Sequence, residues 1–302
     1  MSLRLSILSL PFALALFASN AATGQEAPLL AGERMQLSRL FTNDYLGDGH
    51  DRWRTASYSL SALRPSSDGS VSELRLRWEI VSGADTDLRP GEMPDRNMAG
   101  MIGIGLFRSD RLGAADYRIG ADVTAMGPQT GVVNFQQAVH RVLGMRPPSD
   151  HMESLQLEDE IFLGASGEVG RDFSYAASSA RAWISASSGT ETFIRAGIDY
   201  SWGAASAGFG VRDEVTGWRL PVTKGFSGTG TTLYAGADIA KIYDTRLLRS
   251  DEFEDIRIRA RIGAKMETQS MGLFYGVTWL SEEFRLQQEP QFLGSLAVSA
   301  RF

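Results

Sequence analysis

Three histidines are the main candidates for acid–base chemistry near neutral pH in this sequence. The chain of 302 residues contains His50, His140 and His151, and it has no cysteine. His140 follows Gln136 by four residues in a stretch with helical spacing, so both side chains share one face of the expected helix. A neutral imidazole is suited to activate water as a general base. We therefore take His140 as the candidate base, against the alternative of an ordinary surface histidine, and expect His50 and His151 to be solvated loop residues.

Carboxylate, amide and hydroxyl side chains are grouped around one expected hairpin. Asn43 and Asp44 end the first expected strand, and Asp51 and Thr55 stand where the second begins. A hairpin brings such segments side by side. Carboxylate and amide oxygens are the ligands that Ca²⁺ prefers, so Asp44 and Asn43 are candidate metal ligands. The alternative is that these residues only form a turn, which Asn and Asp both favour.

Several other kinds of chemistry are excluded. Without cysteine the chain has no disulfide scaffold, no thiolate nucleophile and no Cys-ligated zinc. No Gly-x-Ser-x-Gly elbow occurs for a serine nucleophile. The glycines of Gly100–Gly105 are not followed by an expected helix, which argues against a nucleotide-binding loop. The net charge of −6 argues against nucleic-acid binding, which needs a basic surface.

Alternation of apolar and polar residues with a period of two runs through most of the chain. From Ile256 to Ile262, apolar residues alternate with three arginines. Successive side chains of a strand point to opposite faces, so each such stretch predicts a strand with one apolar and one polar face. Twelve strands are expected, near 33–46, 51–64, 72–83, 96–109, 115–126, 154–165, 174–185, 191–202, 231–244, 256–268, 270–282 and 292–302. Many are long enough to cross a bilayer when tilted.

The N-terminal residues have the layout of a secretory signal peptide. Arg4 is followed by an apolar run from Leu5 to about Ala18 and then by small residues, so residues 1–24 are expected to be removed, with cleavage at about 21–24. Residues 25–302 then form a single domain. Export, long strands, their even number and an alternating segment that ends on Phe302 together favour an all-β, twelve-stranded antiparallel transmembrane β-barrel in the bacterial outer membrane. The alternative is a soluble periplasmic β protein.

One stretch breaks the strand pattern and predicts a short helix after the fifth strand. Within 131–143 the apolar residues recur at helical spacing, at Val132, Phe135, Val139 and Leu143. Gly144 and then Pro147-Pro148 follow, as is typical where a helix ends. A helix with a polar face has no role in closing a barrel. We therefore expect it to lie against the rim or in the lumen and to carry a site that includes His140.

Four short motifs stand in order along the chain. They are Asn43-Asp44, Asp51-Arg52 with Thr55, Asp95-Arg96 with Ala99-Gly100, and Gly127-Pro128 with Gln136-Gln137, His140-Arg141 and Gly144. Gln156-Leu157 with Glu160 follows the last of them. Together with the expected signal peptide and barrel, these motifs resemble the outer-membrane lipid A deacylases of the LpxR type over most of the chain.

That resemblance implies an esterase that hydrolyses the 3′-acyloxyacyl ester of lipid A and requires a divalent cation, Ca²⁺. It implies that His140 is the general base on water and that Asn43, Asp44 and Thr55 position water, cation or oxyanion. Lipid A or lipopolysaccharide and outer-membrane lipid would be the partners, and the oligomeric state stays open. Two alternatives remain: a non-catalytic barrel, either a narrow channel or a structural protein, and a phospholipase-like barrel.

The even strand number also predicts where the site lies. Both termini then lie on one side of the membrane, which is the periplasmic side in barrels of this kind, with short turns there and longer loops outside. The first and fifth strands would both end outside. Asn43-Asp44 and the helix with His140 are therefore expected to share the extracellular rim.

Overall fold

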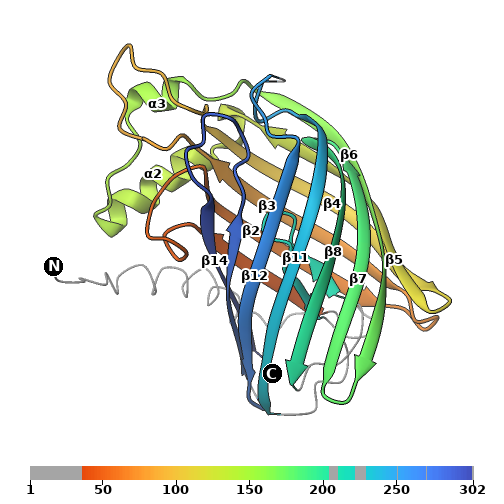
Figure 1. Cartoon of the computed structure of the whole chain (residues 1–302). Helices are drawn as coiled ribbons and strands as arrows, with labels where there is room; N and C mark the ends of the chain where they lie inside the picture. The colour runs from red at the N-terminus through yellow and green to blue at the C-terminus, as the bar shows by residue number, and fades with distance from the viewer. Residues whose placement is uncertain (1–35, 204–209, 222–228, 250, 270, 301–302) are drawn as a thin grey trace, which may run out of the picture.

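Twelve long strands make up most of the molecule (Figure 1). The structure, a computed structural model, describes residues 36–203, 210–221, 229–249, 251–269 and 271–300, so the expected signal peptide and Phe302 lie outside the described residues. The strands are β1 Gln36–Asn43, β2 Arg54–Pro65, β3 Val71–Val81, β4 Ala99–Leu112, β5 Ala115–Met126, β6 Glu160–Tyr175, β7 Ser178–Ser188, β8 Glu191–Gly203, β11 Gly230–Thr245, β12 Ile256–Glu267, β13 Met271–Leu280 and β14 Gln291–Ala300.

These strands close into one antiparallel barrel, which confirms the expected fold. The order around the barrel is β1-β14-β13-β12-β11-β8-β7-β6-β5-β4-β3-β2, and β1 closes the ring by pairing with both β2 and β14. Each expected segment overlaps one strand of the ring. The largest difference is at β6, which runs from Glu160 to Tyr175 rather than from about 154 to 165. A short helix takes up residues 150–154.

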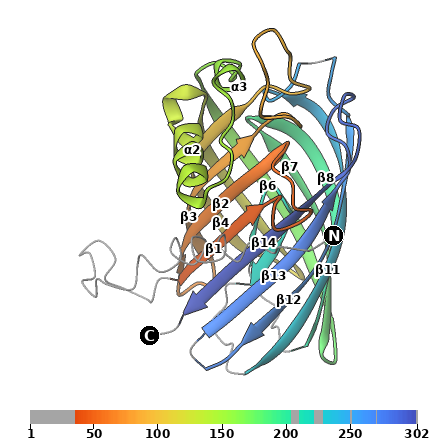
Figure 2. The same cartoon turned by 90° about the vertical axis from the view of Figure 1, so that its left-hand side faces the viewer.

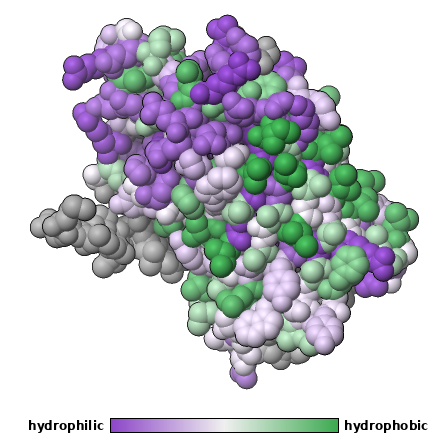
Figure 3. Space-filling model, in the orientation of Figure 1, coloured by the Kyte–Doolittle hydropathy of each residue, from purple (hydrophilic) through white to green (hydrophobic). Residues whose placement is uncertain are grey.

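The period of two separates a polar lumen from an apolar outer wall. On β12 the three arginines that alternate with apolar residues are buried in the lumen: Arg257, Arg259 and Arg261. The isoleucines between and beside them are exposed on the outside: Ile256, Ile258 and Ile262. Figure 3 shows such apolar side chains over the barrel wall, with hydrophilic ones gathered at the end that carries the helices. The lipid replaces the second sheet that a soluble sandwich would need.

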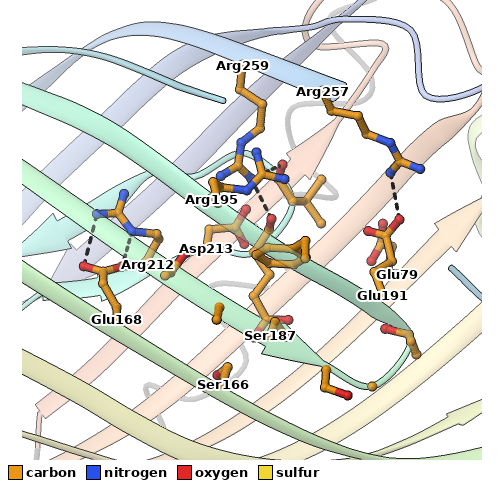
Figure 4. Close-up of a pocket in the computed structure, with 18 of the residues that line it drawn as sticks. Glu79, Ser166, Glu168, Ser187, Glu191, Arg195, Arg212, Asp213, Arg257 and Arg259 are labelled. Carbon is orange, nitrogen blue, oxygen red and sulfur yellow. Dashed lines mark hydrogen bonds and ion pairs between the residues drawn. The ribbon is translucent and has the colours of Figure 1, made fainter. Parts of the chain in front are cut away.

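Ion pairs fill much of the lumen. The buried Asp238 accepts from three arginines of β8 and β12: Arg195, Arg259 and Arg261. Nearer the loop end, Arg54 pairs with three glutamates from other elements: Glu79, Glu191 and Glu283. Between such groups lies a cavity of about 110 Å³. Figure 4 shows Arg257 pointing to Glu191 and Arg212 to Glu168 around it. The charged walls of this cavity are paired with one another, so the cavity is part of the packed interior.

A second, two-stranded sheet lies inside the barrel and was not expected from the sequence. It is a hairpin of β9 Gly210–Arg212 and β10 Arg219–Pro221. Trp218 is buried against Phe274 of β13, with ring centroids 5.0 Å apart. It sits in a hollow over Gly263 and Gly276, because a Cβ at either glycine would press against the indole. Three-residue strands leave too weak an alternation to be recognised in a sequence.

Ion pairs hold the same hairpin to the opposite wall. Arg212 pairs with Glu168 of β6 at 2.5 Å and with Asp199 of β8 at 2.9 Å. Glu214 pairs with Arg77 of β3 at 2.7 Å and with Arg75 at 3.2 Å. Since the hairpin contacts both sides of the ring, it occupies the lumen as a plug.

The helices lie between β5 and β6 and outside the lumen (Figures 1 and 2). They are the 3₁₀ turn η2 Pro128–Thr130, α2 Val132–Leu143 and α3 Asp150–Ser154. Gly131 and Gly144 bound α2 in left-handed conformations, which confirms the expected helix and its end. The helix packs against β3 and β4, with Phe135 edge-on to Trp78 at 6.3 Å. No helix in the described part of the chain is long and apolar enough to span a membrane.

The buried face of α2 differs from the expected apolar stripe. Val132 and Val133 face the wall above Gly100 of β4, while Phe135 is exposed at its edge. The other buried positions on the helix are polar, namely Gln136 and His140. Apolar residues of α2 can stay exposed because the helix stands beside a membrane-spanning wall. The polar pair shares one face of the helix, as expected from its i, i+4 spacing, and the structure shows that this face is buried.

Loop lengths follow the expected pattern with two exceptions. Turns such as those after β2, β4 and β6 are short at one end, and residues 44–53, 82–98 and 127–159 form long loops at the other. The β7–β8 turn at Gly189 is short although it lies at the loop end, and the long segment with the β9–β10 hairpin leaves from the other end. Asn43, Asp44 and α2 lie together at the loop end. That this end faces outside the cell stays a prediction.

Candidate active site

Like Thr55, Asp44 is a fully buried member of the candidate site. It directly follows β1 and is 0% exposed. Its Oδ1 accepts from the Tyr45 backbone N–H at 2.8 Å and its Oδ2 from that of Arg52 at 2.6 Å. The carboxylate thereby fixes both ends of the β1–β2 loop.

A single hydroxyl joins Asp44 to a second carboxylate. Thr55 Oγ1 lies 3.2 Å from Asp44 Oδ2 and also donates to Asp51 Oδ1. Asn43 donates from Nδ2 to the Thr55 carbonyl at 2.8 Å, so it sets the backbone that carries this hydroxyl. The residues of the expected hairpin cluster are thus brought together, with Asn43 acting on Thr55 through its amide nitrogen.

His140 reaches this cluster from α2. Its Nδ1 lies 3.0 Å from the Arg146 carbonyl, and its Nε2 lies 3.5 Å from Asp51 Oδ2. Because a carbonyl only accepts, Nδ1 carries a hydrogen in this contact, and Nε2 is the ring nitrogen on the side of Asp51. The imidazole is 6% exposed. A ring oriented in this way can accept a proton at Nε2 and then be stabilised by the Asp51 charge.

The two carboxylates leave excess negative charge at the site. Burial, and then the neighbouring charge of Asp51, raise the pKa of Asp44 well above its ordinary value, although backbone N–H groups oppose the shift. No group of three or more His, Asp or Glu side chains suited to a metal is found among the described residues. The donors present are two carboxylates, one hydroxyl and the Asn43 amide, all of the hard-oxygen kind that Ca²⁺ takes. The donor chemistry and the excess charge therefore fit a divalent cation that keeps water among its ligands.

The sequence model of the family described as "Outer membrane protein LpxR" matches residues 8–302. The chain belongs to the LpxR family. This places the protein in the outer membrane and supports lipid A deacylation at the level of the family. No curated protein matches the sequence.

A solved structure of LpxR shares the fold of this chain. LpxR from Salmonella typhimurium superposes with a TM-score of 0.72 at 17% identity, covering 89% of this chain and 100% of the other. The β domain of the Bordetella autotransporter BrkA gives 0.45 at 11% identity, covering 89% and 99%. The KdgM porin gives 0.41 at 7% identity, also covering 89% and 99%.

Asp51 is a residue of this candidate site that had no predicted role of its own. In the described part of the chain, its contact with His140 is the one direct link between the hairpin cluster and that histidine. Its spacing to Thr55 placed it in a motif, but the carboxylate contacts a helix far along the sequence. A role for Asp51 could have been suspected only from the position of the motif.

Gln136 adds an acceptor beside the base. It lies one turn before His140 on the same buried face, and its Oε1 has no hydrogen-bond partner among the described residues. A buried acceptor without a donor is costly, which makes it a ready partner for a hydroxyl or amide N–H of a bound substrate.

The other two histidines lie away from this cluster. The His50 side chain is 58% exposed and contacts Asp48, as expected of a loop residue. His151 was expected in a loop and instead lies in α3, where its Nε2 is 2.9 Å from the Glu92 carbonyl. The N-cap Ser149, which accepts from Met152 N–H, starts this helix directly after the prolines.

Proposed function

We propose that the protein hydrolyses the 3′-acyloxyacyl ester of lipid A at the cluster of Asp44, Asp51, Thr55 and His140. The observation that carries the proposal is the 3.5 Å approach of His140 Nε2 to Asp51, which places a buried base against a carboxylate pair. The site lies where α2 meets the β1–β2 loop at the end of the barrel, outside the lumen. An acyl chain held in the outer leaflet can therefore reach it without entering the plugged lumen.

Hydrolysis of the ester consumes one water, and the residues of the site transfer its proton. His140 Nε2 takes a proton from water while the water oxygen attacks the ester carbon. The Arg146 carbonyl holds the Nδ1 hydrogen, and Asp51 stabilises the charge on the ring. The same proton then passes to the leaving alkoxide, so the products are a fatty acid and an alcohol. Asn43 acts by holding the backbone of Thr55.

Asp44 and Asp51 would hold the divalent cation, with Asn43 as the further oxygen ligand. A bound divalent cation stabilises negative charge that develops on the ester oxygen. The excess charge of the carboxylate pair supports this assignment, because a cation would keep the buried Asp44 ionised.

Mass spectrometry of lipid A tests the substrate assignment. Lipid A from cells that express the wild-type protein is expected to lose the mass of one acyloxyacyl group, compared with lipid A from cells that lack it. Cells expressing His140→Ala at equal levels are the matched control. Unchanged lipid A together with free fatty acid from glycerophospholipids would instead support the phospholipase-like alternative.

The lumen argues against the channel alternative. Because the described hairpin is held by ion pairs and by the Trp218 hollow, we expect the purified barrel to give no steady current in planar bilayers. Trp218→Ala loosens the plug and should produce opening events. Trp202→Ala, at an exposed tryptophan of β8, is the control and should stay silent. Large steady currents from the wild-type protein would favour a channel.

A further inference from the structure

The turn that carries Asp51 and Thr55 has an unusual backbone. Trp53 has φ of 53°, a left-handed value that side chains other than those of Asn, Asp and His seldom adopt. This residue reverses the chain between Asp51 and Thr55. The reversal lets Thr55 Oγ1 donate to Asp51 Oδ1, so the conformation of Trp53 sets the relation between two members of the candidate site.

Gln291 holds this backbone from the start of β14. Its Nε2 donates to the Arg52 carbonyl at 2.7 Å, and its Oε1 accepts from the Arg54 backbone N–H at 3.3 Å. A third, longer bond runs from Nε2 to the Arg54 carbonyl at 3.4 Å, so the amide reaches the residues on either side of Trp53. Gln291 is 2% exposed, so both ends of its amide are used inside the protein. The side chain closes the turn from the lumen side.

Asp95 holds the same turn through the side chain of Trp53. Its Oδ2 accepts from the Trp53 indole N–H at 2.9 Å, and its Oδ1 accepts from the Ala84 backbone N–H at 2.8 Å. The Trp53 carbonyl also accepts from the Ser82 N–H at 2.7 Å. Trp53 is itself almost completely buried. The β3–β4 loop contains the Asp95-Arg96 motif. It thus holds the turn through the indole and the carbonyl of Trp53, whereas Gln291 bonds to the two neighbouring residues.

We propose that Gln291 and Asp95 are positioning residues that hold Trp53 in its left-handed conformation and so aim Asp51 at His140. The inference rests on the proposed function for its effect on rate. The side-chain hydrogen bonds of Gln291 and Asp95 go to Arg52, Trp53, Arg54 and Ala84, so each residue acts through the turn. Loss of the hydrogen bonds of Gln291 or Asp95 lets the backbone of Trp53 leave its left-handed conformation, which moves the Asp51 carboxylate. A displacement of about 1 Å can cost about 10²-fold in rate.

The first test is the kinetics of Gln291→Met. This substitution keeps the side-chain volume and removes the hydrogen bonds of the amide to the backbone of Arg52 and Arg54. We expect kcat on lipid A to fall about 10–100-fold while KM changes less than about 3-fold, because the loss is in alignment rather than in binding. Gln287→Met is the matched control, since Gln287 is equally buried and bonds only within its own loop. The contact of Asp95 with the Trp53 indole is tested by two further variants. Asp95→Asn keeps one acceptor oxygen and should retain more activity than Asp95→Leu.

The second test does not depend on deacylation. Trypsin can cut after Arg52 or Arg54 only if the turn opens, so the folded wild-type and Gln287→Met barrels should resist cleavage there. Gln291→Met and Asp95→Leu should be cut at these sites while the barrel band remains heat-modifiable. A protected turn in both variants, or an unchanged kcat in both, would overturn the positioning role. An inactive wild-type protein would refute the proposed function, and proteolysis alone would then decide the role of the two residues.

Discussion

We expect His140→Ala to lower the rate of lipid A deacylation by ~10²–10⁴-fold, which is the usual effect of removing a general base. The barrel should still form, because His140 lies on α2 outside the ring of strands and its imidazole contacts the Arg146 carbonyl and Asp51 rather than a strand. The rate is measured on lipid A in detergent with purified protein. Folding is checked by the shift of the unheated band on a gel.

The other histidines provide the controls for that result. His50→Ala and His151→Ala should retain near-normal turnover, since His50 contacts only Asp48 and His151 bonds to a loop carbonyl. Near-normal turnover by His140→Ala would show that the base is misassigned. A severe loss confined to His151→Ala would move the site to α3.

The second large effect concerns the carboxylate pair. We expect Asp51→Asn and Asp44→Asn each to lower the rate at least ~10²-fold, because the site loses charge that stabilises the protonated ring and holds the cation. Asn43→Ala should also reduce the rate by releasing the Thr55 backbone. Asp68→Asn is the control, since Asp68 lies in the exposed turn between β2 and β3 and bonds to Ser70.

Chelation separates the cation from the base. EDTA followed by dialysis should reduce wild-type turnover to the level of the Asp44→Asn variant, and added Ca²⁺ should restore the wild type. The Ca²⁺ that saturates the wild type should fail to restore Asp51→Asn, since its defect includes the contact with His140. Full activity in dialysed, chelated protein would remove the cation from the proposal and leave the water-and-base chemistry standing.

The barrel and its helix follow from local patterns. Alternation from Ile256 to Ile262 predicts both the strand β12 and the side on which its arginines lie, because one face of each strand must meet lipid. Gly131 and Gly144 similarly bound α2, since glycine readily adopts the left-handed conformation found at both positions. The motifs placed the candidate site at Asn43, Asp44, Thr55 and His140 before any contact was known.

Other features depend on contacts between residues far apart in the chain. Asp51 meets His140 only because β1 and β5 end, and β2 begins, at the same end of the barrel. Gln291 reaches the Trp53 turn only because β14 closes the ring beside β1. The hairpin of β9 and β10 is likewise held by Glu168 and by the hollow under Trp218 rather than by its own three-residue strands. Local sequence sets the direction in which each side chain points. Which partner it meets is set by the register and closure of the whole barrel.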